Sequence, residues 1–303
     1  MKYQIIIFLL GFSTFTTVTC GQTIKEGKAK VNDETFSYSY MESKQETNGI
    51  LILLPGWGES PKSIFKKTKL PLFLSEKGYV TIVPKLHQTL YLDDYTISEI
   101  NEIIKIQSER YNSKELSVVI GGLSAGGAIA IAYAEHILAT SATVKLKAVF
   151  AIDPPLDLSR IYFSAENKIR YICQNKLINK EGTFTKNYLH QNLKGSPKET
   201  PDNYLKYSAF SAGAADGGKA KFLQNIPVRL YSEPDLEFVR KTYCSELQYD
   251  DINAVDLEKM QQFLIGIGNS RAEYITTMGK GFHSWNIMDA SDCVNWILKT
   301  TGF

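Results

Sequence analysis

The chain has 303 residues and a mass of 34.1 kDa, enough for one large α/β domain or two small ones whose core needs no metal or disulfide. Its composition, 44% hydrophobic and 22% charged, excludes a disordered chain, a collagen-like repeat and a polytopic membrane protein. The net charge of +2, from 34 basic and 32 acidic residues, argues against a nucleic-acid-binding protein.

The N-terminus has the parts of a secretory signal peptide. Lys2 is followed by an apolar run from Ile5 to Phe12 and then by small and hydroxyl residues up to Gly21. The apolar run is too short to span a bilayer. We therefore expect residues 1–21 to be removed, and the mature protein (22–303) to be periplasmic or extracellular without a transmembrane span. The alternative is a buried N-terminal strand.

Cys20 leaves the end of this segment open. Cleavage before Cys20 would make it a lipidated first residue and the protein a membrane-anchored lipoprotein, but Thr17 and Thr19 match that signal poorly. Release as a soluble protein is the other outcome. Export would place the remaining cysteines in a disulfide-permissive compartment, with one pair plus a free thiol, or no bridge, as alternatives: Cys173, Cys244 and Cys293.

Further along the chain, strands and helices alternate. Residues 28–43 suggest a hairpin that turns at Asn32 and Asp33. Continuous apolar runs, typical of strands buried on both faces, follow at Gly49–Leu54, Tyr79–Val83, Leu116–Ile120, Leu146–Ile152, Val228–Tyr231 and Glu273–Met278. Helical stretches such as Ser98–Ser108 and Ala125–Ala139 lie between them. This alternation predicts a mostly parallel sheet with helices on both faces.

The segment from about 154 to 225 interrupts this rhythm. It is rich in Tyr and Phe and too long for an ordinary connection. We expect an insertion that forms a lid over the carboxyl edge of the sheet, where substrate choice would lie. A small helical subdomain without a substrate role is the alternative. A second, smaller insertion is expected between Glu237 and Ser270.

The strongest chemical signal is Gly122-Leu123-Ser124-Ala125-Gly126. This G-x-S-x-G pattern stands directly after a predicted strand and directly before an Ala-rich helix. A serine in a sharp strand-to-helix turn needs small neighbours, and the turn exposes its hydroxyl above the sheet. The pattern predicts that Ser124 is a nucleophile. A glycine-rich turn that only packs a helix against a strand is the alternative.

A serine nucleophile needs a base, and the chain has four histidines. His136 falls about three turns into the helix after Ser124, too far to meet it. His190 lies in the insertion, and His87 follows a strand at its carboxyl end, where it would line a pocket or remain a loop residue. His283 follows the last predicted strand and precedes the last helix. It is the predicted base, because a loop at that position can reach Ser124.

The acid that orients the base should follow an intervening strand. The strand in 226–235 stops at an acidic turn, so Asp235 is the first choice for the partner of His283, with Glu233 as first substitute. Asp153, at the end of the preceding strand, is the second substitute. Each acid stands next to a proline and would otherwise be an ordinary turn residue.

The loop after the first buried strand predicts an oxyanion hole. It reads Pro55-Gly56-Trp57-Gly58, and its glycines allow the backbone to approach a ligand closely. The backbone N–H of Trp57 would pair with that of Ala125 around one oxygen. A turn that buries the indole is the alternative.

Together these residues resemble the α/β-hydrolase family, from about Gly49 to the C-terminus. Ser124, Asp235 and His283 follow the family's order of nucleophile, acid and base. Two features depart from its pattern. Pro55 stands where the family has a histidine, and the stretch from Asp235 to His283 is longer than usual. The resemblance implies an α/β-hydrolase fold with an inserted lid, and transfer of an acyl group to water through an acyl-enzyme.

The sequence therefore predicts an exported serine hydrolase, a carboxylic ester hydrolase first of all. It would act on a small-molecule or glycan-linked ester without a cofactor or metal. A serine peptidase or amidase on the same fold, or an exported binding protein without catalysis, are the alternatives.

Overall fold

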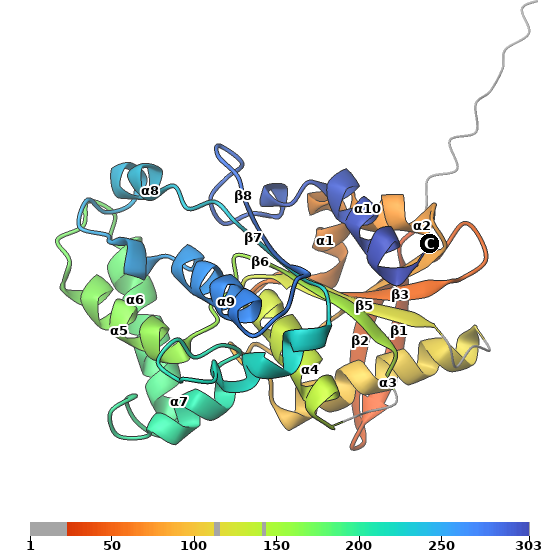
Figure 1. Cartoon of the computed structure of the whole chain (residues 1–303), viewed down its shortest axis with the longest axis horizontal. Coiled ribbons are helices and arrows are strands. Elements are labelled where there is room, and N and C mark those ends of the chain that lie inside the picture. The colour runs from red at the N-terminus through yellow and green to blue at the C-terminus, as the bar shows by residue number, and fades with distance from the viewer. Residues whose placement is uncertain (1–22, 112–115, 141–143, 303) are drawn as a thin grey trace, which may run out of the picture.

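The computed structural model describes residues 23–111, 116–140 and 144–302. The predicted signal peptide and Cys20 lie outside the described residues. In the described part of the chain the strands form one sheet in the order β1-β2-β4-β3-β5-β6-β7-β8 (Figure 1). The strands are β1 (Lys25–Val31), β2 (Glu34–Met41), β3 (Gly49–Leu54), β4 (Tyr79–Pro84), β5 (Ser117–Leu123), β6 (Leu146–Ile152), β7 (Val228–Ser232) and β8 (Ala272–Thr276).

The sheet is antiparallel at one edge and parallel elsewhere. β1 and β2 form the predicted hairpin, in which Asn32 and Asp33 have φ values of 47° and 67°, and β2 pairs antiparallel with β4. From β4 to β8 all neighbours are parallel. Strands β3, β4 and β5 are buried along their whole length, as their continuous apolar runs predict. The parallel strands therefore bring their carboxyl ends to one edge.

Helices cover both faces of the sheet. On one face α3 (Asp94–Arg110), α4 (Ala125–Thr140) and α9 (Ala254–Gly266) pack on a core that includes Ile103, Ile131 and Met260. On the other face α1 (Pro61–Lys67), α2 (Leu70–Ser75) and α10 (Ala290–Thr301) pack on a core that includes Ile64, Leu74 and Trp296. Figure 1 shows the two layers on opposite sides of the strands. The prediction of a mostly parallel sheet with helices on both faces is confirmed.

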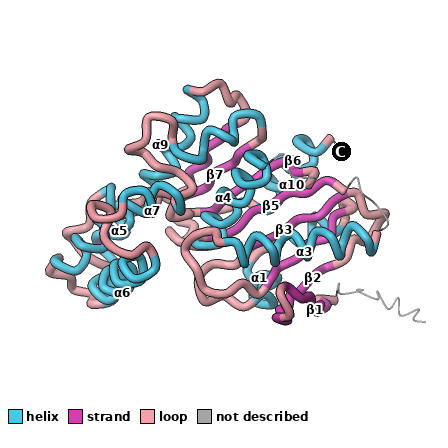
Figure 2. The backbone as a smooth tube through the Cα atoms, turned by 90° about the horizontal axis from the view of Figure 1, so that it is seen from below, coloured by secondary structure: helices cyan, strands magenta, loops and turns pink. Residues whose placement is uncertain are grey.

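Two segments between strands form extra helices. Residues 154–225 contain α5 (Leu158–Arg170), α6 (Leu177–Asn192), α7 (Pro201–Tyr207) and the 3₁₀ helix η1 (Gly218–Asn225). Helices α5 and α6 project beyond the end of the sheet (Figure 2). Residues 237–270 contain most of α8 (Leu236–Thr242), then the 3₁₀ helix η2 (Tyr249–Asp251) and α9. A disulfide between Cys173 and Cys244 joins the two segments, while Cys293 is a buried free thiol.

Candidate active site

Ser124 occupies the turn between β5 and α4. Its φ of 56° is a left-handed conformation that side chains rarely adopt. A Cβ on Gly122 would lie 2.6 Å from the carbonyl carbon of Gly126, and a Cβ on Gly126 would clash with the carbonyl oxygens of Leu54 and Pro55. Both glycines are therefore required by close backbone contacts. Ser124 is half-buried between the buried residues Leu123 and Ala125, so the strained turn exposes it.

His283 lies in the loop between β8 and the 3₁₀ helix η3 (Trp285–Ile287). Its Nδ1 is 2.5 Å from Oδ2 of Asp153, which is 4% exposed and directly follows β6. The backbone N–H of Ser124 donates a hydrogen bond of 2.8 Å to the carbonyl of Ile152, the residue before Asp153. The turn that holds the serine is thus bonded to the strand end that holds the acid. Because β5 and β6 are parallel neighbours, both groups stand at one edge of the sheet.

Asp235, the first choice for the acid, lies elsewhere. Its carboxylate caps α8 by accepting a hydrogen bond of 2.8 Å from the backbone N–H of Phe238. The expectation that Asp235 orients His283 is therefore corrected: the imidazole bonds to Asp153, the second substitute. Asp235 caps α8, whose N-terminal N–H groups need an acceptor. Asp153 ends β6, which lies between β5 and β7, so the packing of distant segments places it against His283.

Glu233, the first substitute, contacts the backbone next to the histidine instead of its ring. Its carboxylate accepts hydrogen bonds from the N–H groups of Lys280, Gly281 and Phe282, at 2.6, 3.2 and 2.9 Å. Burial opposes its ionisation, but these donors together lower its pKa. Phe282 has a φ of 54°, so the carboxylate holds a strained loop in place. Glu233 is a candidate positioning residue for His283.

The electrostatics of His283 suit a general base. Desolvation lowers the pKa of the imidazole, but the hydrogen bond and the negative charge of Asp153 outweigh it, and the pKa is raised. The side chain is 40% exposed, so substrate and water can reach it. Because Asp153 bonds to Nδ1, the ring directs Nε2 away from the acid and leaves it available for a proton from a hydroxyl.

The loop after β3 offers backbone donors. Neither the N–H of Trp57 nor that of Ala125 donates a hydrogen bond within the described residues. The N–H of Gly56 is occupied, because it donates to the carboxylate of Glu59 at 2.7 Å. The same carboxylate accepts from the indole of Trp285 at 3.1 Å, and so connects the loop of Trp57 to the loop of His283. Sequence reasoning missed Glu59, although its place just after the Gly-Trp-Gly turn was a signal.

The inserted helices contact this loop. The ring of Trp57 packs edge-on against Phe184 and Tyr188 of α6, with centroids 5.5 and 5.4 Å apart. Phe282, beside His283, packs against the cluster around the Cys173–Cys244 disulfide. The insertion therefore borders the candidate site from both sides. The indole of Trp57 is half-buried in this contact.

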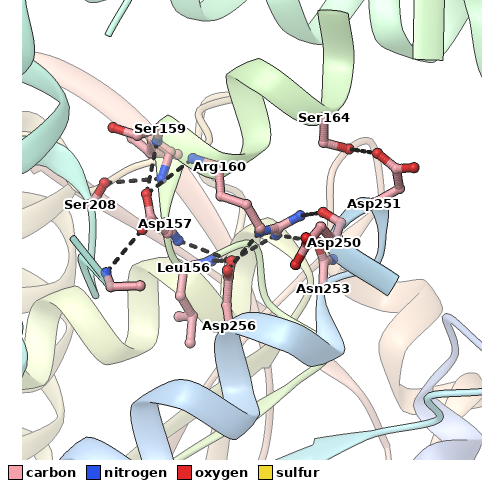
Figure 3. Close-up of polar contacts among 12 residues, drawn as sticks. Leu156, Asp157, Ser159, Arg160, Ser164, Ser208, Asp250, Asp251, Asn253 and Asp256 are labelled. Carbon is pink, nitrogen blue, oxygen red and sulfur yellow. Dashed lines mark hydrogen bonds and ion pairs between the residues drawn. The ribbon is translucent and has the colours of Figure 1, made fainter. Parts of the chain in front are cut away.

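A polar network holds the backbone around Asp153. The side-chain amide of Asn253 donates to the backbone carbonyl of Asp153 at 3.0 Å, and its oxygen accepts from Arg160 at 3.3 Å. Arg160 of α5 forms a two-pronged ion pair with the buried Asp256 of α9, at 2.6 and 2.7 Å (Figure 3). Asp256 also accepts the N–H of Leu156. The network fixes the chain that follows Asp153, and no motif in the sequence indicated it.

The other histidines have separate surroundings. His87 bonds to Asp93 at 2.8 Å, and this bond raises its pKa. His190 is 3.4 Å from the hydroxyl of Tyr162 in the insertion, and His136 lies in α4. Within residues 23–111, 116–140 and 144–302 no group of three His, Cys, Asp or Glu side chains is arranged to hold a metal. Over the same residues no helix has the length and apolarity needed to cross a membrane.

Solved structures similar to this chain include esterases and a peptidase. An esterase from Pyrococcus furiosus matches at 12% identity and a TM-score of 0.58, over 93% of this chain and 92% of its own. Carboxyl esterase 2 of the mycorrhizal fungus Tuber melanosporum matches at 14% identity and 0.61, over 94% and 89%. An acylaminoacyl peptidase from Pyrococcus horikoshii matches at 12% and 0.59, over 92% of this chain and 42% of its own.

The chain has the α/β-hydrolase fold. The fold predicted from the sequence is therefore confirmed. No family model and no curated protein matches the sequence. At these identities the solved structures establish the arrangement of strands and helices, while the chemistry must be argued from the residues at the carboxyl edge of the sheet.

Proposed function

We propose that this protein is a serine hydrolase that cleaves carboxylic esters, with Ser124 as nucleophile, His283 as general base and Asp153 as the acid that orients it. The observation that carries the proposal is the 2.5 Å contact between His283 and Asp153 at the edge where Ser124 stands in a strained turn. Asp153 replaces Asp235 in the proposed triad because only the former bonds to the imidazole.

The proposed reaction has two halves. Nε2 of His283 takes the proton of Ser124 as Oγ attacks the ester carbonyl, and the developing oxyanion accepts hydrogen bonds from the N–H groups of Trp57 and Ala125. The protonated imidazole then gives its proton to the leaving alcohol, and an acyl-serine remains. Water, deprotonated by the same nitrogen, attacks the acyl-serine and releases the acid, which restores the serine hydroxyl.

Labelling with a fluorophosphonate probe tests the nucleophile. The parent protein should be labelled at one residue, and Ser124→Ala should not be labelled. Ser117→Ala, which changes the first residue of β5, the strand that precedes Ser124, is the matched control and should label like the parent. Labelling that survives in Ser124→Ala, or that is absent from the parent, would contradict the proposal.

Amide hydrolysis is the second candidate, because one of the similar structures is an acylaminoacyl peptidase. An ester needs less help to expel its leaving group than an amide, and the described site offers only His283 as a proton donor to that group. We therefore expect p-nitrophenyl esters to be cleaved at least about 10²-fold faster than matched p-nitroanilides. Equal rates on both would favour the peptidase or amidase.

Export is part of the same proposal. The sequence of residues 1–21 and the Cys173–Cys244 disulfide both fit a protein of an oxidising compartment. Expression of the full chain in a bacterial host, followed by mass analysis, should give a product that begins between Cys20 and Gln22. Incorporation of labelled palmitate that is lost in Cys20→Ser would identify the anchored form, and its absence the released one.

A further inference from the structure

A cleft of about 420 Å³ lies beside the proposed oxyanion hole. Its walls are strand β2, the loop from Pro55 to Lys62 and the loop from Lys85 to Thr89 after β4, and Ala125 and Ile129 of α4 also line it. At the Thr89 end its wall is bonded to α6, because the hydroxyl of Tyr188 is 3.4 Å from that of Thr89. The volume lies in the range that holds a small molecule or a substantial part of one.

The position of the cleft indicates which part of an ester substrate it would bind. The leaving oxygen must lie near His283 to receive a proton, but no residue from Gly279 to Trp285 lines the cleft. Trp57 and Ala125, which would hold the carbonyl oxygen, do line it. Because the cleft adjoins these oxyanion donors but not the loop of His283, the substituent of the carbonyl carbon on the cleft side is the acyl group and not the leaving group. The cleft therefore faces the acyl group.

The charges in the cleft are matched except for one. Glu26 pairs with Lys62 at 2.9 Å, and His87 pairs with Asp93 at 2.8 Å. Glu59 is saturated by Lys67, by the N–H of Gly56 and by the indole of Trp285. The ammonium group of Lys85 has no carboxylate partner among the described residues, and its exposed side chain lines the cleft. The cleft thus carries one uncompensated positive charge.

We infer that this cleft is an acyl subsite for esters whose acyl group ends in a carboxylate, that is, for half-esters of dicarboxylic acids, with Lys85 as the residue that selects the charge. Hydrogen-bond donors from Ser37, Ser60 and Gln88 surround the same space and suit an acceptor-only group. Trp57, Leu86 and Ile129 provide an apolar wall for the methylene chain. The inference rests on the proposed ester hydrolysis and specifies its substrate.

The experiment compares isosteric substrates. Mono-p-nitrophenyl esters of glutaric, adipic and pimelic acid are each paired with the p-nitrophenyl ester in which an isopropyl group replaces the terminal carboxylate, which removes the charge at similar size. Rates measured with Ser124→Ala are subtracted as background. The parent should favour the charged member of at least one pair by about threefold or more in kcat/KM, mainly through KM. The preference should shrink in 0.5 M NaCl, because salt screens an exposed pair.

Three variants assign the preference. Lys85→Met should abolish the charged-to-neutral ratio, and Lys85→Glu should invert it. Lys66→Met, which removes an exposed lysine of α1 outside the cleft, should keep the ratio of the parent. A parent that hydrolyses both members of every pair equally, or a ratio that Lys85→Glu leaves unchanged, overturns the subsite while the proposed function stands.

A binding measurement keeps the two hypotheses separate. Monomethyl adipate should bind to Ser124→Ala in calorimetry more tightly than methyl 6-methylheptanoate, and the double variant Ser124→Ala, Lys85→Met should lose the difference. If no ester is hydrolysed but this difference is present, the ester hydrolysis fails and the cleft stands as an anion-selective site. If the difference is absent, the subsite is refuted.

Discussion

The carboxyl ends of β6 and β7 each present a carboxylate to the loop of His283, and the two are used differently. Asp153, after β6, bonds to the imidazole itself, whereas Glu233, after β7, bonds to three backbone N–H groups next to it. Asp235, two residues further, contacts neither and caps a helix. Proximity of an acid to a strand end therefore does not define its role, since the donor that it meets does.

The largest effect is expected from Asp153→Asn. An amide in place of the carboxylate would favour the wrong tautomer of His283 and remove the charge that stabilises the imidazolium, so kcat should fall by about 10⁴-fold. Steady-state kinetics on a p-nitrophenyl ester measure this. If Asp153→Asn keeps more than a tenth of the parent's kcat, the assignment of the acid to the end of β6 is wrong.

The pH profile of the parent gives a second view of the same contact. A histidine can serve as a base only when neutral, and the pKa of His283 is raised because of Asp153, so under the proposed mechanism the acidic limb of kcat/KM should lie above the ordinary histidine value of about 6.5. In Asp153→Asn, whose residual activity still depends on the ring, the limb should move to lower pH. A limb that does not move would show that Asp153 does not set this pKa.

Glu233→Gln should have an intermediate effect. The amide NH₂ would replace one of the two carboxylate oxygens and cannot accept its hydrogen bonds, either that from Lys280 or those from Gly281 and Phe282, so the loop should loosen, with kcat falling about 10- to 100-fold and the free energy of unfolding by about 1–3 kcal/mol. Glu237→Gln, an exposed acid nearby, is the control and should change neither quantity. A kcat loss as deep as that of Asp153→Asn would mean that Glu233 is the acid.

A smaller effect is expected from Asn253→Ala, which removes the donor to the carbonyl of Asp153. The loss of one hydrogen bond, about 1 kcal/mol, should lower kcat by about fivefold with little change in KM. Asn253→Asp distinguishes the two contacts of this residue, because it keeps an acceptor for Arg160 and loses the donor. Full activity in Asn253→Asp would assign the role to Arg160 alone.

The smallest effect is expected from Asp235→Asn. Asparagine caps helices about as well as aspartate, so α8 should remain stable to within about 0.5 kcal/mol and kcat should change less than twofold. Thermal unfolding and ester kinetics measure the two quantities. A loss of several powers of ten would restore the order of acid and base expected from the sequence.

Much of the fold followed from the sequence alone. Buried parallel strands are largely apolar, so β3 and β6 were predicted with their observed bounds, and the hairpin turn at Asn32 and Asp33 was marked by residues that tolerate positive φ. The turn at Ser124 was likewise predictable, because close backbone contacts leave room only for glycine at Gly122 and Gly126. These features depend on contacts close in the chain.

The choice among the three acids did not follow from the sequence. Asp153, Glu233 and Asp235 all stand at strand ends beside prolines, and their local patterns are alike. Which of them meets His283 depends on where a loop from β8 crosses the ends of β7 and β6, and on the network of Asn253 and Arg160 behind Asp153. The pairing of Cys173 with Cys244, 71 residues apart, likewise depends on how distant segments pack and did not follow from the sequence.

The sequence by itself determined the nucleophile turn, the parallel sheet and the histidine loop as candidates, since each is encoded by neighbouring residues through sterics and hydrophobic periodicity. Only the tertiary structure decided the partner of His283 and the uncompensated charge of Lys85. Whether a polar group finds a hydrogen-bond or ion-pair partner in a distant segment depends on which elements pack together. The whole fold determines that packing.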